Sequence, residues 1–207
     1  MDHSGLVGVY LAAGKSSRMG RNKLNLPLGI HCLGSIALRA ALESKLEITF
    51  AVTRKGDSLH WVAPFSQKRG LRIIECEEAD SGQSESLKTG VKAAVELGAA
   101  GVVVLLADQP FVTTEVINKL IDLFQGSEEF IAYSNYDVLK PPVLLSKRLF
   151  PRIMDLSGDQ GARRLLRNAA VGKQIKLDND IYFFDVDTIE DYQFLLRNGP
   201  FLRDGEG

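Results

Sequence analysis

The sequence has no excess of basic residues, few cysteines and no long apolar run. Its 207 residues carry a net charge of −1, so no basic field indicates a general nucleic-acid binder. Two cysteines, Cys32 and Cys76, form no C-x-x-C pair, and we interpret them as small buried hydrophobic residues in a reduced protein. No basic leader follows Met1, and the longest apolar run, residues 97–107, is interrupted by glycine and shorter than the roughly 20 residues of a membrane span. We therefore expect a soluble, cytoplasmic protein that binds neither nucleic acid nor membrane.

Short apolar segments alternate with amphipathic ones along most of the chain. The segment 102–106 is apolar at every position, as in a parallel strand covered on both faces. This alternation predicts βαβ units and an α/β fold with a Rossmann-like, doubly wound, mostly parallel sheet. No repeat or linker divides the chain, so we expect one domain over residues 1–207. The expected strands are 6–11, 48–53, 71–74, 102–106, 130–134 and 182–186; the expected helices are 33–43, 85–97, 113–123, 159–168 and 188–196, and 140–150 is broken by proline.

A loop of small and basic residues follows the first expected strand. Residues 11–23 read L-A-A-G-K-S-S-R-M-G-R-N-K, and ligands of α/β sheets bind where strands end. Small residues let backbone N–H groups approach phosphate oxygens, while Arg18 and Lys23 supply charged donors. Neither the Walker A pattern nor G-x-G-x-x-G fits these residues. A solvated basic turn is the alternative, which the position after a buried strand disfavours, so the loop predicts a triphosphate site.

Carboxylates are expected at the same edge of the sheet. Asp108 ends the strand 102–106, and Mg²⁺ in phosphate chemistry is held by one or two carboxylates together with the substrate. Asp185 and Asp187 close the last expected strand, where alternation places them on one face. One of them could complete a metal site and the other cap the helix beginning near Thr188. For Asp108, the alternative is a turn aspartate before Pro110.

A polar segment, residues 81–90, reads S-G-Q-S-E-S-L-K-T-G and leads into a helix. The free N–H groups of a helix N-terminus suit a nucleotide base or a phosphate. Serine and glycine at such a place are equally typical of ordinary helix capping. The segment is therefore a second candidate for nucleotide binding that needs support from its surroundings.

Together these segments resemble a known family. Residues 11–23 are similar to the pattern L-A-A-G-x-S-x-R-M-G-x-x-K of the MobA-like nucleotidyltransferases, and later segments resemble their molybdenum cofactor cytidylyltransferase branch. The matching segments keep the family order from about residue 7 to residue 196. The first segment is specific to the superfamily, and its combination with residues 158–163 is specific to the branch. The later segments are G-Q-S-E-S-L-K-T-G at 82–90, L-A-D-Q-P at 106–110, P-V-L-L at 142–145, S-G-D-Q-G-A-R at 157–163 and D-V-D-T-I-E-D-Y at 185–192.

The resemblance implies a fold of the nucleotide-diphospho-sugar transferase type. A nucleotide-binding half would span about residues 6–125 and an acceptor-binding half about residues 130–198. The implied reaction is Mg²⁺-dependent transfer of CMP from CTP to the phosphate of molybdopterin, with release of pyrophosphate. Its product would be a cytosine dinucleotide cofactor for a hydroxylase of the xanthine dehydrogenase type, a possible partner. Such a transfer needs positioning and charge stabilisation rather than a protein nucleophile, which suits a chain whose three histidines form no evident triad.

The resemblance also implies roles for individual residues. Ala13 favours cytosine, because guanylyltransferase relatives carry glycine there and a methyl group narrows the base pocket. Asp187 is preferred over Asp185 as the second metal ligand. The implied sets are catalytic Arg18, Lys23 and Asp108; nucleotide-binding Leu11, Ala12, Ala13, Gly14, Ser16, Arg18, Lys23 and Ser86; acceptor-binding Gly158, Asp159 and Arg163; and metal-binding Asp108, Asp187 and Asp185.

Two segments depart from the family pattern, and both lie towards the acceptor side. Residues 140–143 read K-P-P-V where the family often has G-H-P-V, and residues 75–78 read E-C-E-E where it has Asn-Pro. Two other functions therefore stay open. One is a guanylyl- or other nucleotidyltransferase with a different phosphate acceptor. The other is a non-catalytic, nucleotide-binding chaperone that docks on its client molybdoenzyme.

Overall fold

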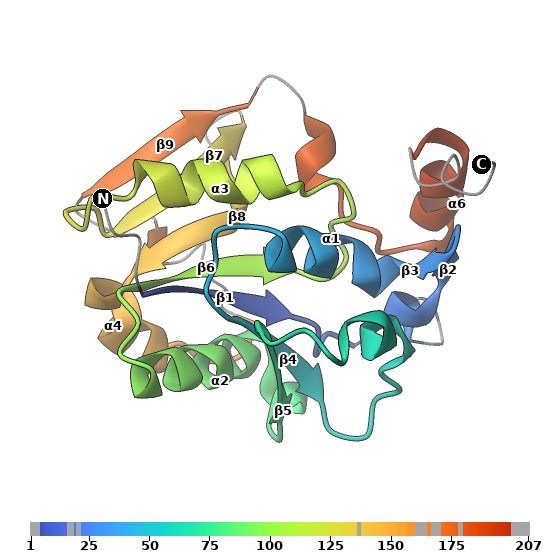
Figure 1. The fold of residues 1–207 in the computed structure, drawn as a ribbon, viewed down its shortest axis with the longest axis horizontal. Coiled ribbons are helices and arrows are strands. Elements are labelled where there is room, and N and C mark those ends of the chain that lie inside the picture. Colours follow the sequence, from blue (N-terminus) through green and yellow to red (C-terminus); the bar gives the residue numbers. More distant parts are fainter. Residues whose placement is uncertain are drawn as a thin grey trace.

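A seven-stranded sheet with helices on both faces forms the body of the protein (Figure 1). The computed structural model describes residues 5–15, 19, 22–135, 138–159, 165–166, 171–177 and 180–199. The strand order is β5-β4-β1-β6-β8-β7-β9, and a separate two-stranded sheet pairs β2 with β3. The strands are β1 Leu6–Leu11, β2 Pro27–Leu28, β3 His31–Cys32, β4 Thr49–Arg54, β5 Leu71–Cys76, β6 Gly101–Leu106, β7 Phe130–Asn135, β8 Val138–Ser146 and β9 Gly172–Lys176.

The sheet is parallel except at one strand. β5, β4, β1 and β6 pair in parallel, β8 runs antiparallel to both β6 and β7, and β9 is parallel to β7. The predicted single α/β domain with a mostly parallel, doubly wound sheet is therefore confirmed. Among the described residues, no helix combines the length and the hydropathy of a membrane span.

Helices cover both faces of the sheet in the described part of the chain. α1 and α3 pack on one face, and α2 and α4 on the other (Figure 1). α6 lies beyond the edge of the main sheet beside β2 and β3. The helices are α1 Leu33–Leu42, α2 Gln83–Glu96, α3 Thr114–Leu123, α4 Phe150–Met154 and α6 Ile189–Asn198, with short 3-10 helices η2 Lys23–Asn25, η3 His60–Phe65, η4 Ala79–Ser81, η5 Lys147–Leu149 and η6 Asp180–Phe183.

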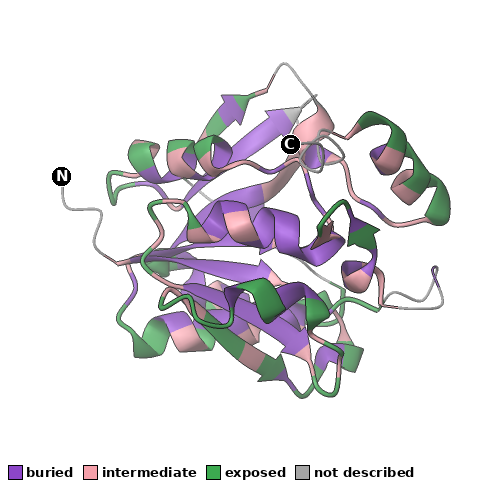
Figure 2. Ribbon diagram, turned by 45° about the vertical axis from the view of Figure 1, so that its right-hand side comes forward, coloured by how far each residue is buried: buried purple, intermediate pink, exposed green. Residues whose placement is uncertain are grey.

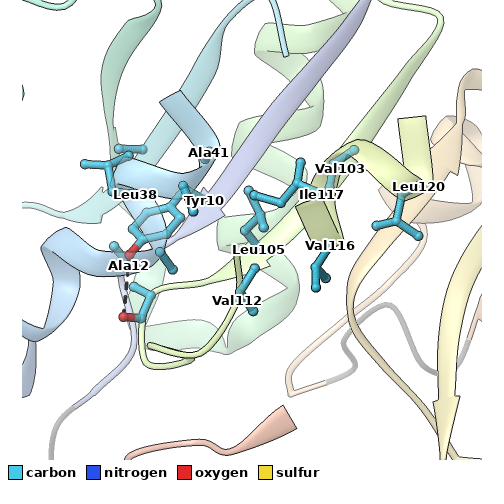
Figure 3. Packing of buried hydrophobic residues seen from close by; sticks show 14 of the residues in the cluster. Tyr10, Ala12, Leu38, Ala41, Val103, Leu105, Val112, Val116, Ile117 and Leu120 are labelled. Atoms are coloured by element: carbon cyan, nitrogen blue, oxygen red, sulfur yellow. Dashed lines mark hydrogen bonds between the residues drawn. The ribbon is translucent and has the colours of Figure 1, made fainter. Parts of the chain in front are cut away.

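The central strands are buried on both faces (Figure 2). Alternation sends Tyr10 and Leu105 towards α1 and α3, as Figure 3 shows, while Val9 and Val104 face α2. The Tyr10 hydroxyl donates a hydrogen bond to the carbonyl oxygen of Gly34 at 2.7 Å, which satisfies its buried polar group. α2 approaches β1 so closely that a Cβ at Gly90 would lie 2.4 Å from Val9. This close packing brings the start of α2 near the loop that follows β1.

The expected last strand is wrong. Residues 180–183 form the 3-10 helix η6, and residues 184–187 have no regular secondary structure. The aromatic rings explain the difference, because Phe183 packs beneath the sheet beside Tyr133, whereas Phe184 packs outside it against Phe111. Phe183 thus belongs to the core cluster of the main sheet and Phe184 to the cluster beside α6, and the backbone between them is not a strand.

Two further expectations fail in the second half of the chain. Strand β8 continues through Pro141 and Pro142, which fall at an irregularity where the pairing passes from Lys140 to Val143. Neither proline has a ladder partner there, so the missing N–H groups cost little. β9 was not foreseen, because its sequence G-K-Q-I-K is polar. Of the expected helix 159–168, residues 160–164 and 167–168 lie outside the described residues, and residues 165 and 166 are helical.

Candidate active site

A cavity of about 480 Å³ opens at the carboxyl ends of β1 and β6. It contains six of the residues expected in the site, namely Leu11, Ala13, Gly14, Ser86, Asp108 and Asp159. Of the rest of its lining, Lys15, Gly82, Gln83 and Leu106 lie in the segments 11–23, 81–90 and 106–110, whereas no sequence pattern indicates Ala79 and Asp80. The arrangement follows from the topology, since parallel strands end at one edge of the sheet.

Ala12 and Ala13 face opposite ways. Ala13 is 2% exposed and lines the cavity, whereas the Ala12 side chain packs in the core beneath α1. The Ala12 side chain therefore does not line the cavity, because alternation at the end of β1 turns its methyl group inward, and a nucleotide contact of Ala12 stays a prediction. Ser16, Arg18 and Arg163 lie outside the described residues.

An ionic network fixes one wall of the cavity. Arg54 donates to the carboxylate of Asp80 at 2.5 Å and to the carbonyl oxygen of Ala13 at 3.4 Å. Lys15, on the loop after β1, pairs with the same carboxylate at 2.9 Å. Hydrogen bonds from Lys15 and then Arg54 hold the pKa of Asp80 at about 2. Asp80 therefore joins the loop after β1 to η4, which immediately precedes α2.

The start of α2 faces the cavity without a side-chain cap. Gly82 occupies the N-cap position with φ 123°, and no serine side chain caps the helix. Glycine therefore caps this helix, as the capping interpretation expects, whereas no serine side chain does. Instead, the amide of Ser84 donates to the carbonyl oxygen of Gly158 at 3.1 Å. A Cβ at Gly82 would lie 2.3 Å from that carbonyl group, so this contact requires glycine. Gly158 thus contacts the helix start, and Asp159 follows it into the cavity wall.

Lys23 lies between two carboxylates beside the cavity. Its ammonium is 2.7 Å from Asp108 Oδ2 and 2.9 Å from Asp187 Oδ1. The three residues come from η2, the end of β6 and the segment before α6, so distant parts of the chain converge here. Burial lowers the pKa of Lys23, but the charges and hydrogen bonds of Asp108 and Asp187 outweigh it, and the pKa is raised. Lys23 is therefore a cation at neutral pH.

The convergence of Asp108 and Asp187 on one positive charge fits the donor set of a magnesium site. Mg²⁺ commonly takes one or two carboxylates and completes its shell with water and phosphate oxygens. Among the described residues, no group of three or more histidine, cysteine or acidic side chains is arranged to hold a metal. A metal held here by Asp108 and Asp187 would thus depend on the nucleotide for further ligands.

Asp185 faces a different partner. Its Oδ1 accepts a hydrogen bond of 2.8 Å from Gln109 Nε2. Burial is the main cause of its raised pKa, which the Gln109 hydrogen bond partly offsets and the charge of Asp108 increases further. Because residues 184–187 are not a strand, the alternation that put both aspartates on one face does not hold. The geometry favours Asp187 over Asp185 as the partner of Asp108.

The position of Asp187 is fixed from both sides. The amide of Val186 donates to the carbonyl oxygen of Asp108 at 3.0 Å, which ties the two segments together. Thr188 caps α6, and the Asp191 carboxylate accepts hydrogen bonds from the amides of Asp187 and Thr188 at 3.0 and 2.8 Å. Neither Asp185 nor Asp187 caps the helix, as one of them was expected to do. A capping box instead holds Asp187 in place.

A parallel sheet, a loop of small residues, an open helix start and paired aspartates around one cavity together define a nucleotide-binding α/β protein. The chain belongs to the family of the MobA-like NTP transferase domain, whose sequence model matches residues 8–175. The expected family and its nucleotidyltransferase fold are thereby confirmed.

Relatives match over nearly the whole chain. It is 39% identical over 201 residues to the purine catabolism protein PucB of Bacillus subtilis, covering 93% of this chain and 96% of the relative. It is 28% identical over 207 residues to a probable molybdenum cofactor guanylyltransferase of Mycobacterium avium, covering 95% and 98%. The crystal structure of Rv0371c from Mycobacterium tuberculosis superposes with a TM-score of 0.79 at 26% identity, covering 94% and 100%.

Proposed function

We propose that the protein transfers CMP from CTP to the phosphate of molybdopterin, releasing pyrophosphate and forming a cytosine dinucleotide cofactor. The observation that carries this proposal is the convergence of Lys23, Asp108 and Asp187 beside the cavity at the ends of β1 and β6. The family supports nucleotidyl transfer. The names of the relatives, which refer to the molybdenum cofactor and to purine catabolism, support the acceptor and a client of the xanthine dehydrogenase type.

In this proposal the protein positions the acceptor phosphate and the triphosphate of CTP and neutralises part of their negative charge. A phosphate oxygen of the acceptor attacks the α-phosphorus of CTP, and the bond to pyrophosphate breaks on the opposite side. Asp108 and Asp187 would hold Mg²⁺, which neutralises charge on the triphosphate when bound. Lys23 adds a charged donor beside them for the departing pyrophosphate. Leu11, Ala13, Gly14 and Ser86 line the space for the base and ribose, and Ser16 and Arg18 would add phosphate contacts.

Ala13 supports cytosine over guanine. Ala13 lines the cavity while its side chain belongs to the core cluster under α2, and its carbonyl oxygen accepts a hydrogen bond of 3.4 Å from Arg54. The wall therefore cannot easily retreat from a larger base. Guanylyl transfer is the second candidate, because relatives that share 28% of their residues with this chain are named guanylyltransferases.

The test measures pyrophosphate release with each of the four NTPs, with and without molybdenum-loaded molybdopterin. We expect release that requires both CTP and the acceptor, and an increase of GTP use in Ala13→Gly. Preference for GTP by the wild type would replace the cytidylyl proposal by guanylyl transfer. No release with any NTP would overturn the enzyme proposal altogether.

Asp108→Ala and Lys23→Ala separate the enzyme from a nucleotide-binding chaperone. Both substitutions should abolish pyrophosphate release while the protein remains folded by circular dichroism. A chaperone would instead continue to activate its client molybdoenzyme when Asp108 is replaced. Activation of a client hydroxylase by the Asp108→Ala variant would therefore favour the chaperone.

A further inference from the structure

Lys140 lies at the edge of the sheet where β1 and β6 end, here called the catalytic edge, because β8 is antiparallel to β6 and β7. β6 ends at Leu106, two residues before Asp108, and its residue Val104 pairs with Val143 of the antiparallel strand β8. Lys140 precedes Val143 by three residues, on the side towards which β6 runs. The start of β8, rather than its end, thus reaches the edge that carries the aspartates. This is also where K-P-P-V replaces the family's G-H-P-V.

The ammonium of Lys140 is held near the aspartate segment. It lies 5.9 Å from the centre of the Phe183 ring, a distance typical of a cation–π contact. Phe183 ends η6, two residues before Asp185. The positive charge of Lys140 also acts on Asp185, whose pKa it lowers against the larger effect of burial. The Lys140 side chain is half-buried.

Lys140 differs from the other cations at this edge. Lys23 is bound by Asp108 and Asp187, while Lys15 and Arg54 are bound by Asp80. No residue in the described part of the chain forms a hydrogen bond or an ion pair with the ammonium of Lys140. Its three donors are therefore available to a ligand.

We propose that Lys140 binds the phosphate monoester of the acceptor and so helps select a phosphorylated acceptor over its dephosphorylated form. This inference rests on the proposed function, in which an acceptor phosphate must come close to the α-phosphorus. An approaching phosphate meets the negative charge of Asp185, which repels it and whose hydrogen-bond donor, Gln109, is neutral. A lysine is a compact point charge suited to phosphate, and Lys140 lies on the β8 side of the aspartates, whereas the cavity lies on the α2 side.

The test compares equilibrium binding of molybdopterin and of its phosphatase-treated form, both handled without oxygen and followed by pterin fluorescence. Wild type, Lys140→Met and Lys140→Arg are titrated, with Lys147→Met as the matched control. Lys147 is an exposed lysine just beyond the other end of β8. Lys140→Gln replaces Lys140→Met if the latter fails to fold.

We expect wild type to bind the phosphorylated pterin at least about tenfold more tightly than the dephosphorylated form. Lys140→Met should lose this preference while its affinity for the dephosphorylated pterin and its KM for CTP stay unchanged. Lys140→Arg should retain much of the preference, and Lys147→Met all of it. The proposal is overturned if Lys140→Met keeps the full preference, or if wild type shows none. Because this readout is binding, a lack of pyrophosphate release would overturn the proposed reaction without deciding the role of Lys140.

Discussion

Gln109 donates a hydrogen bond to Asp185 across the junction between β6 and the segment before α6, with 2.8 Å between Nε2 and Oδ1. Gln109 is 1% exposed, and its Oε1 has no hydrogen-bond partner among the described residues. The neighbouring bond from the Val186 amide to the Asp108 carbonyl joins the same two segments. Gln109 therefore helps to position Asp187 beside Lys23 through Asp185.

Replacing Gln109 should loosen this junction. Gln109→Leu leaves the half-buried Asp185 carboxylate without its donor, which we expect to lower the free energy of unfolding by about 1–3 kcal/mol. Gln109→Glu should cost more, because it places a second carboxylate against the first. Urea denaturation of the three proteins measures both effects. Equal stability of all three would show that the hydrogen bond does not hold the junction together.

Asp185 and Asp187 should respond differently to neutralisation. Asp187→Asn removes a carboxylate that converges with Asp108, and we expect kcat to fall by about 100-fold or more and Mn²⁺ binding to weaken. Asp185→Asn keeps an oxygen that can accept from Gln109, so activity and Mn²⁺ binding should stay near those of wild type. Electron paramagnetic resonance of Mn²⁺ measures binding independently of turnover. Equal losses in the two variants would contradict the assignment of Asp187.

Gly82→Ala should destabilise the protein through backbone strain and through a steric clash, and Gly98→Ala measures the strain alone. Gly82 has φ 123°, and an added Cβ would lie 2.3 Å from the Gly158 carbonyl group. Gly98 has φ 69° with nothing within 4 Å of an added Cβ, so Gly98→Ala should cost only about 1 kcal/mol of backbone strain. We expect Gly82→Ala to cost about 3 kcal/mol. Thermal unfolding compares them, and equal costs would mean that the Gly158 loop moves aside freely.

The ionic network around Asp80 predicts a pH dependence. Its folded pKa of about 2 lies below the ordinary 3.8, chiefly through Lys15 and then Arg54. A depressed carboxyl pKa contributes stability that is present above the ordinary value and lost as the pH falls through the folded value. Lys15→Met and Arg54→Met should each raise the pKa of Asp80 towards 3.8. Carboxyl ¹³C NMR titration measures it, and high salt should reduce the difference because the carboxylate is exposed. An Asp80 pKa that neither variant changes would contradict the network.

The sequence was most informative where local pattern and chain topology agree. The run 102–106 and the loop 11–15 could be placed because a buried parallel strand must end at the ligand-binding edge. The pattern failed at residues 182–186, whose composition suits a strand but whose rings Phe183 and Phe184 pack in different clusters. β9 was missed because an edge strand needs few apolar residues. Contacts such as Gln109 with Asp185 join residues 76 apart in sequence, and no local pattern reports them.

Strand β8 consists of two parts with different freedom to change in evolution. Residues 143–145 pair with both β6 and β7, whereas residues 138–140 pair with β7 alone. Substitutions at residues 138–140 can therefore change the side chains near an acceptor while the strands around the nucleotide cavity keep their hydrogen bonds. Lys140, which stands where the family often has the glycine of G-H-P-V, lies in this second part. Substitutions at the start of the antiparallel strand β8 would thus let related proteins bind different acceptors with the same nucleotide site.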